Sequence, residues 1–342
     1  MISPRIAKLL LLCATVSLLG SPAANAAGRV RLKIATIAPD GSSWMKSFRA
    51  MDKEVRAATK NRVRFKAYPG GVQGDEKDVL RKIRIGQLHG GGFTGLGMGA
   101  IFPDTLVVAV PMLVQTYDEI DYIKEELGDY FRKGIADNGF VLLGWQEVGF
   151  VYLMSKTPIR TMDDLRKVRI WAWQGDQVAP AVFREAKINP VYLAVHDVLP
   201  ALQTGLLDAT YSSPLGAVVL QWHTKIKYMN DVPLTYALSG IVVTKKAFDK
   251  IPANLQPVVL NICERYLRDQ VIKTREDNAK AIEVLKKRGV EMISLAPEAR
   301  RELEGIFLTS GERLSGKVFS RAVFTKTKKL LAEYRAKKKE AQ

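Results

Sequence analysis

Hydrophobic and polar residues alternate along this chain in segments that switch between a strand-like and a helix-like period. Residues 29–38 (RVRLKIATIA) and 61–68 alternate at every second position, which predicts two strands. The segments 44–60 and 75–85, which follow them, repeat apolar positions at helical spacing and are predicted helices. Two strand–helix units in succession are typical of an α/β sheet.

Strand-like and helix-like segments continue to succeed one another as far as the C-terminus. Further strands are predicted at 105–114, 139–144, 208–213, 239–244 and 289–294, and further helices at 118–137, 178–186, 196–204 and 252–288. A short helix should begin after Thr161, because Thr161-x-x-Asp164 resembles a capping box with Asp in place of Glu. The lysine-rich residues 336–342 are expected to be a frayed, solvated tail.

The segment 158–214 contains the strongest candidate for a binding site. Residues 167–173 (KVRIWAW) predict a short buried strand, whose period of two would place Arg169, Trp171 and Trp173 on one face. A guanidinium beside two indoles suits an organic anion with apolar bulk. The same spacing also fits core tryptophans beside a surface arginine, so the pattern leaves both interpretations open.

The N-terminus has the features of a secretory signal. Arg5 and Lys8 precede an apolar run at 9–19, and Ala24-Asn25-Ala26 supplies a small-x-small cleavage site. We therefore expect a signal peptide at 1–26, cleavage before Ala27, and export to the periplasm. Cys13 would leave with the signal, and Leu12 before it makes a poor lipoprotein site.

Composition narrows the class of protein. Of 342 residues, 47% are hydrophobic and 25% charged, as in an ordinary globular protein of one large or two medium domains. The net charge of +17 would fit a nucleic-acid-binding protein. The predicted export signal and the lack of a nucleic-acid recognition module argue against that function. Cys263 alone remains after cleavage, so we expect no disulfide and a packed thiol.

The sequence carries no recognisable catalytic, metal or cofactor motif. Its three histidines show no H-x-x-x-H spacing, and neither C-x-x-C nor G-x-S-x-G occurs. The glycine-rich segment 90–99 lacks the G-x-G-x-x-G spacing, and we expect it to be a backbone-exposing loop at a strand end. His196-Asp197 is best explained by helix capping. We therefore predict a protein that is not an enzyme and needs no cofactor.

Several short motifs, in this order, resemble the extracytoplasmic solute receptors of TRAP transporters, the DctP family. Each is weak alone, but their order and spacing from about residue 30 to 288 make the combined signal strong. They are Gly70-x-x-Gln73-Gly74, Ile83-x-x-Gly86-Gln87-Leu88, Pro103 with Val110-Pro111-Met112-Leu113, residues 139–145, Thr157-Pro158-Ile159 with Asp163-Asp164-Leu165, Lys167-Val168-Arg169, Asn189-Pro190, and residues 201–208.

The resemblance implies a two-domain α/β periplasmic-binding-protein fold with mixed sheets flanked by helices, a ligand cleft and one long helix spanning both domains. The chain would cross between domains near Phe150 and Ala237. Residues 27–149 with 238–275 would form domain I, 150–237 with 276–325 domain II, and 326–342 a basic C-terminal tail. Ligand binding would close the cleft by a hinge motion.

The resemblance, together with the pattern of residues 167–173, gives a set of predicted ligand-binding residues. Arg169 falls on the family's arginine that pairs with the ligand carboxylate, and Tyr192 falls near a pocket aromatic. Ser212 or Ser213 stands in place of a pocket asparagine. The full set is Arg169, Trp171, Trp173, Tyr192, Tyr211, Ser212, Ser213, Trp44 and Phe93.

One departure from the family changes the expected ligand. Many members carry a second arginine in G-F-R, whereas this chain has Gly149-Phe150-Val151, although another basic residue could substitute from elsewhere. We expect a monomeric receptor that passes an organic acid or an amphiphilic, largely apolar solute to the small and large membrane subunits of a permease. The alternative is a binding protein for a neutral hydrophobic or lipid-like ligand, with Arg169 structural. An exported enzyme on the same fold is the third hypothesis, which the missing motifs disfavour.

Overall fold

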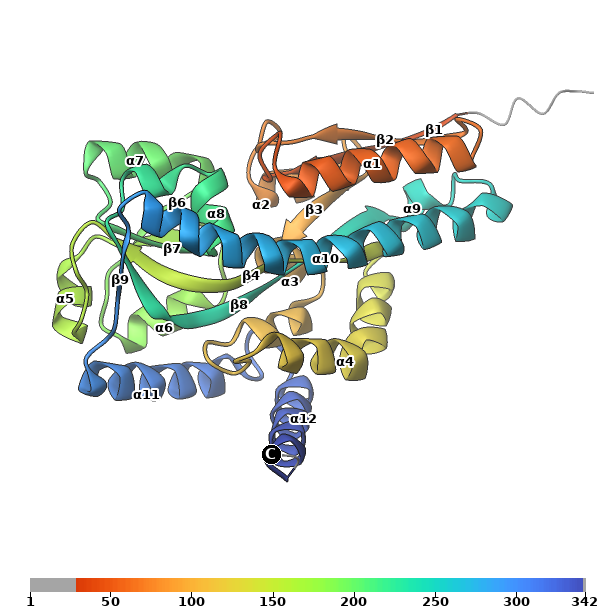
Figure 1. Ribbon diagram of the computed structural model, residues 1–342. Helices are drawn as coiled ribbons and strands as arrows, with labels where there is room; N and C mark the ends of the chain where they lie inside the picture. The colour runs from red at the N-terminus through yellow and green to blue at the C-terminus, as the bar shows by residue number, and fades with distance from the viewer. Residues whose placement is uncertain (1–28, 341–342) are drawn as a thin grey trace, which may run out of the picture.

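The computed structural model describes residues 29–340, which fold into two α/β lobes joined by long strands (Figure 1). The signal peptide and its cleavage site lie outside the described residues. The strands are β1 (Val30–Thr36), β2 (Val63–Tyr68), β3 (Gly90–Thr94), β4 (Phe140–Ser155), β5 (Trp171–Trp173), β6 (Val191–Leu193), β7 (Ala209–Ser212), β8 (Tyr228–Thr244) and β9 (Glu291–Ile293).

The helices cover the faces of these strands. They are α1 (Ser43–Ala58), α2 (Glu76–Arg84), α3 (Gly95–Ile101), α4 (Tyr117–Asp137), α5 (Met162–Lys167), α6 (Ala179–Glu185), α7 (Val198–Thr204), α8 (Pro214–Val219), α9 (Lys245–Phe248), α10 (Gln256–Lys287), α11 (Pro297–Leu314) and α12 (Arg321–Glu340), with 3₁₀ turns η1 (Pro103–Ala109), η2 (Val195–Asp197), η3 (Trp222–Thr224) and η4 (Ala253–Leu255). None of the helices within 29–340 has the length and apolar character needed to cross a membrane.

Two long antiparallel strands, β4 and β8, connect the lobes. In the described chain they form the middle of a seven-stranded sheet with the order β2-β1-β3-β8-β4-β7, and β9 pairs with β8. Phe150 lies opposite Tyr236 near the middle of this ribbon. We call the part with β1–β3 and α1–α4 lobe I, and the part with β5–β7, α5–α8 and α11 lobe II. The mixed sheet and the paired crossing strands confirm the predicted fold.

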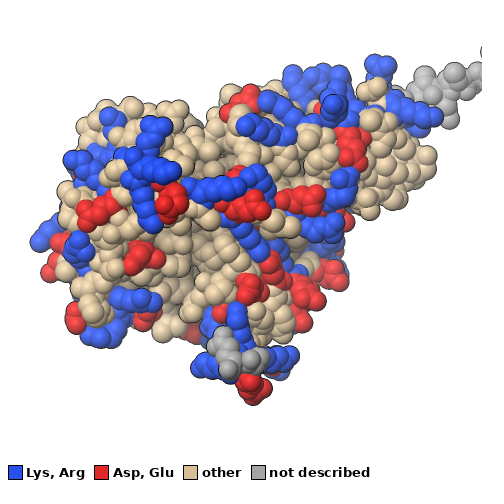
Figure 2. All heavy atoms as spheres, viewed as in Figure 1, with Lys and Arg blue, Asp and Glu red and all other residues tan. Residues whose placement is uncertain are grey.

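The 32-residue helix α10 runs along both lobes, as predicted (Figure 1). It packs on β4, on α1 of lobe I and on α8 of lobe II. Its inner face buries Val259, Cys263 and Leu267, so Cys263 is a packed thiol within the core. Its outer face presents interspersed basic and acidic side chains to solvent (Figure 2).

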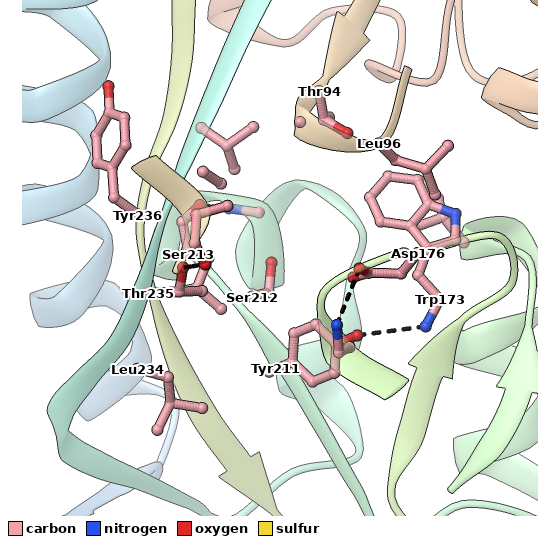
Figure 3. Close-up of a pocket in the computed structure, with 18 of the residues that line it drawn as sticks. Thr94, Leu96, Trp173, Asp176, Tyr211, Ser212, Ser213, Leu234, Thr235 and Tyr236 are labelled. Atoms are coloured by element: carbon pink, nitrogen blue, oxygen red, sulfur yellow. Dashed lines mark hydrogen bonds between the residues drawn. The ribbon is translucent and has the colours of Figure 1, made fainter. Parts of the chain in front are cut away.

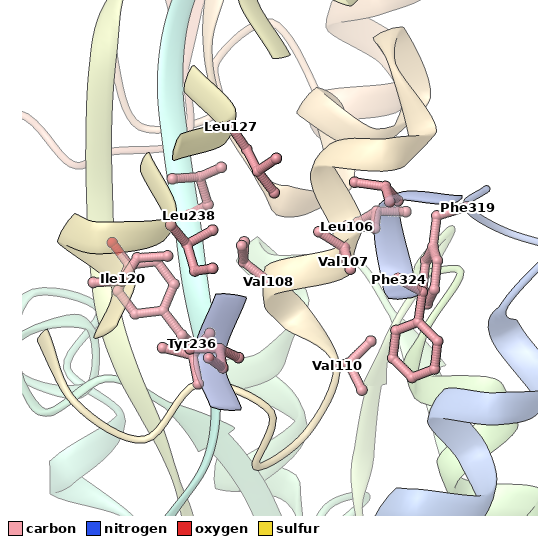
Figure 4. Packing of buried hydrophobic residues seen from close by; sticks show 14 of the residues in the cluster. Leu106, Val107, Val108, Val110, Ile120, Leu127, Tyr236, Leu238, Phe319 and Phe324 are labelled. Atoms are coloured by element: carbon pink, nitrogen blue, oxygen red, sulfur yellow. The ribbon is translucent and has the colours of Figure 1, made fainter. Parts of the chain in front are cut away.

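The lobe I core contains a turn where the sequence predicted an extended run. Residues 105–108, 110 and 114 are buried, but the first part of the run belongs to η1, which begins at Pro103. The Thr105 hydroxyl donates to the Phe102 carbonyl at 2.8 Å. Figure 4 shows the η1 side chains between α4, β8 and the start of α12. The packed residues include Leu106, Val107, Val108, Ile120, Leu127, Tyr236, Leu238 and Phe324.

The glycine-rich segment is also more ordered than predicted. Residues 90–94 form β3 and residues 95–101 form α3, so the expected loop is wrong. The glycines are needed because β3 lies tightly against β8: a Cβ at Gly90 would lie 2.1 Å from the Val242 carbonyl oxygen. The segment therefore serves close packing of backbones.

The basic C-terminus is helical rather than frayed. Residues 326–340 belong to α12, which packs against α4 and η1. Thr327 and Leu331 are buried, and Arg335 pairs with Glu119 of α4 at 2.8 Å. Residues 336–340, where a frayed end was predicted, continue α12 and are exposed to solvent, as expected of a solvated end.

Candidate ligand-binding cavity

A cavity of about 300 Å³ lies between the lobes and extends into lobe II. Lobe I contributes residues of β1, α1 and α3 to its wall, lobe II contributes residues of β5, α6, β7 and α8, and the crossing strands β4 and β8 form its floor. Most of the lining side chains are aliphatic or aromatic, so the cavity is suited to hold apolar groups.

Aromatic rings form the lobe II side of the cavity. Trp171 stacks on Tyr211 at 4.9 Å between ring centroids, and it meets Trp173 at 5.8 Å and Trp222 edge-on at 5.3 Å. All four rings line the cavity. The Trp171 indole donates to the Leu193 carbonyl at 3.0 Å, which fixes the orientation of this ring.

A single loop brings a carboxylate beside these rings. Asp176 is half-buried and lines the cavity, and its Oδ1 accepts hydrogen bonds from the amides of Val178 at 2.7 Å and Ala179 at 3.0 Å. Burial raises the pKa of Asp176, although both amides act to lower it. Burial and then the charge of Asp176 raise the pKa of Tyr211. Figure 3 shows Asp176 beside Trp173 and Tyr211.

Basic side chains are missing from the described part of the cavity wall. Among residues 29–340, no Lys, Arg or His lines the cavity. Val151, which replaces the second arginine of the resembled family, does line it. The described residues therefore supply no substitute for that cation in this conformation.

Arg169 lies outside the cavity. Its guanidinium forms a two-pronged ion pair with Asp208, at 2.7 Å and 2.9 Å, and its side chain is 57% exposed. The pair holds the pKa of Asp208 below its usual range. The strand β5 begins only at Trp171, and the Arg169 carbonyl instead accepts the amide of Asp208 at 2.9 Å. Ile170, between Arg169 and β5, forms a single parallel bridge with Ala209.

The remaining predicted residues divide into two groups. Trp44, Trp171, Trp173, Tyr211, Ser212 and Ser213 line the cavity. Tyr192 and Phe93 do not: Tyr192 is 47% exposed, whereas Phe93 is 1% exposed and packs within the lobe I core. Asp176 was not among the predicted residues, although it lies between Gly175 and the start of a predicted helix.

A charged network lies directly behind the cavity wall, and sequence reasoning missed it too. Glu147 of β4 lines the cavity and accepts from Arg275 of α10 at 2.6 Å and from the Tyr236 hydroxyl. Arg275 also pairs with Asp121 of α4 at 2.6 Å and stacks on Tyr117 at 4.5 Å. The network joins both crossing strands to two helices where the lobes meet.

The part of the chain that the structure describes contains no candidate metal site. Within 29–340, no group of three or more His, Cys, Asp and Glu side chains is placed to hold a metal ion. His196 and Asp197 lie 3.7 Å apart on the surface, and both are about half exposed. Asp197 makes no capping hydrogen bond to α7, so the predicted cap is wrong.

Known proteins similar to this chain include solute-binding proteins, which agrees with a cavity between two lobes. The family model for bacterial extracellular solute-binding proteins, family 7 (DctP), matches residues 34–308. A solute-binding protein of Chromohalobacter salexigens is 28% identical over 165 residues, 48% of this chain and 49% of that protein. The 2,3-diketo-L-gulonate-binding periplasmic protein YiaO of Escherichia coli is 22% identical over 246 residues, 70% of this chain and 74% of that protein.

Solved structures show the same fold. A TRAP periplasmic solute-binding protein of Ralstonia eutropha H16 with bound (S)-2-acetolactate matches with a TM-score of 0.82 and 18% identity, over 89% of this chain and 99% of that chain. A Bordetella pertussis extracytoplasmic solute receptor binding pyroglutamic acid matches with a TM-score of 0.81 and 20% identity, over 87% and 99%. With the family match across both lobes, this protein belongs to the DctP family, the periplasmic solute-binding proteins of TRAP transporters.

Proposed function

We propose that this protein captures a largely apolar solute in the cavity between its lobes and delivers it to the small and large membrane subunits of a TRAP permease. The observation that carries the proposal is the cavity wall, which is built mostly from aliphatic and aromatic side chains. Removing apolar surface from water contributes roughly 25 cal/mol per Å², so such a wall favours a solute with apolar bulk.

A second candidate is a receptor for an organic acid. It is favoured by the solved structures with the same fold, which contain acetolactate or pyroglutamic acid. In this chain such an acid would need a cation, and Arg169 would have to leave Asp208 and turn inward to supply it. The proposal of an apolar solute needs no such rearrangement, and Arg169 then has a structural role.

The proposal includes the path by which the protein reaches its solute. The signal-like residues 1–26 would direct export, and the mature chain would begin at Ala27 and act as a monomer. Domains I and II, divided near Phe150 and Ala237, would close over the solute by bending of β4 and β8.

Titration with 4-phenyl-1-butanol tests the capture of an apolar solute. Trp44, Trp171, Trp173 and Trp222 line the cavity, so binding should change the tryptophan fluorescence of mature protein and raise its melting temperature. Leu234→Glu places a charge in the wall and should abolish both effects. Ile85→Glu, at a position 65% exposed, is the matched control. No response from folded wild-type protein would refute the proposal.

A further inference from the structure

The cavity contains a carboxyl group that no basic side chain of the described residues pairs with. Two carboxylates line it, Glu147 and Asp176. The Glu147 oxygens are occupied by Arg275, which lies behind the wall, and by Tyr236, which also lines the cavity. Asp176 forms no ion pair with any residue of 29–340 and accepts only two backbone amides. Its carboxyl group is therefore open to interaction with whatever enters the cavity.

The geometry of Asp176 leaves one oxygen for a ligand. Both amide hydrogen bonds go to Oδ1, whereas Oδ2 accepts none from residues 29–340. Burying a carboxylate oxygen in an apolar wall costs free energy unless a hydrogen-bond donor contacts it. Figure 3 shows Asp176 within the cavity, with Thr94 and Leu96 of lobe I on one side and Tyr211 of lobe II on the other.

Several hydrogen-bond donors in the cavity wall already donate to other groups of the protein. The hydroxyls of Thr235 and Ser239 donate to backbone carbonyls at 2.7 Å each, and Thr94 donates to Glu76 at 3.2 Å. The Trp171 and Trp173 indoles donate to Leu193 and Asp75. An anionic head would thus lose its hydration beside Asp176 and gain no cation in return.

The aromatic rings beside Asp176 favour the opposite charge. The stacked pair Trp171–Tyr211 and the neighbouring Trp173 line the same side of the cavity. The faces of such rings attract an ammonium group, by about 0.5–2 kcal/mol depending on desolvation. A carboxylate and aromatic faces together therefore select a protonated amine over a carboxylate.

We propose that the solute carries a protonated amino head, which donates to Oδ2 of Asp176, while its apolar body fills the remainder of the cavity. This inference rests on the proposed capture of an apolar solute and names its head group. The basic surface of the protein opposes a cation only at long range, because exposed charges are screened beyond about 8 Å at physiological salt. The contact with Asp176 acts at short range and therefore decides the preference for an amino head over a carboxylate head.

Three probes with the same apolar body test the inference: 4-phenylbutylamine, 4-phenyl-1-butanol and 4-phenylbutyrate, titrated at neutral pH into mature protein. A charge-assisted hydrogen bond contributes roughly 1.5–3 kcal/mol, so the amine should bind at least about tenfold more tightly than the carboxylate. Asp176→Asn keeps an oxygen for the two amides, and it should erase this preference while leaving the alcohol within about threefold of wild type.

Two further variants make the outcome unambiguous. Asp163→Asn removes a charge from lobe II at a side chain 76% exposed and should bind all three probes as wild type does. If Asp176→Asn does not fold, Asp176→Ser removes the charge and retains a capping oxygen. Tightest binding of the carboxylate, or an amine affinity unchanged in a folded Asp176 variant, would overturn the inference and leave the proposed function intact. Binding of none of the three probes would overturn both.

Discussion

The indole nitrogen of Trp173 donates a 2.9 Å hydrogen bond to the carboxylate of Asp75, across the gap between the lobes. The same Asp75 oxygen accepts the Val195 amide at 3.2 Å, and the other oxygen accepts the Glu76 amide at 2.7 Å at the start of α2. Asp75 is 2% exposed. One buried carboxylate therefore caps a helix of lobe I and holds the aromatic wall of lobe II.

Asp75→Ala should lower the free energy of unfolding by about 2–4 kcal/mol. Loss of a helix cap costs about 1 kcal/mol, and leaving buried donors unpaired adds about 1–3 kcal/mol. Urea unfolding at neutral pH measures the change, and the tryptophan emission should shift to the red as Trp173 becomes wetter. Asp78→Asn, on the same helix but partly exposed, is the control. Equal losses in the two variants would show that Asp75 has no special role.

Arg169→Ala should leave ligand affinity unchanged. The guanidinium pairs with Asp208 at the surface and does not reach the cavity, so its removal takes nothing from the solute. Exposed ion pairs contribute little to stability, so the midpoint of urea unfolding should move only slightly. Titration with the phenylbutyl probes measures the affinity. A loss of 4-phenylbutyrate binding in this variant would instead support the organic-acid receptor with Arg169 as its anchor.

Stability should fall as the pH rises from about 5 to 8, because of Glu76. Burial raises the pKa of Glu76 to about 8 from its ordinary 4.5, although Thr94 and Gly97 amides act to lower it. Between these values the folded protein retains a proton that the unfolded chain has released, so each pH unit costs up to about 1.4 kcal/mol.

Urea unfolding of Glu76→Gln across this pH range measures the contribution of Glu76. The substitution leaves no titrating carboxyl at this position, so the decline should become flatter. Glu125→Gln, at an exposed position of α4, should retain the wild-type slope. A Glu76→Gln profile parallel to that of wild type would contradict the assignment.

Arg275→Met should destabilise the protein by roughly 3 kcal/mol, because it leaves the buried Glu147 without its cation. Adding Glu147→Gln to the same variant should recover a large part of this loss, since the remaining amide carries no charge. Urea unfolding of the single and double variants forms a mutant cycle that measures the coupling. Strictly additive losses would show that Arg275 and Glu147 do not stabilise each other.

The amino-acid sequence by itself determined most of the fold, because strand and helix periods are local properties. The long tract that became α10 was visible in it, and so was the Thr161–Asp164 capping box, in which both hydrogen bonds are present. Rings such as Trp171 and Tyr211 were found by their position in the sequence, and the structure places them at the cavity.

Only the tertiary structure decided which charged side chains line the cavity. Arg169, which both the strand pattern and the resemblance pointed to, pairs with Asp208, which lies 39 residues away in the sequence. The contact of Asp75 with Trp173 spans 98 residues. Such pairs depend on how two lobes pack, and no local pattern records them. Residues close together in the sequence therefore determine the helices and strands. Contacts between residues far apart in the sequence determine which charged side chains line the cavity.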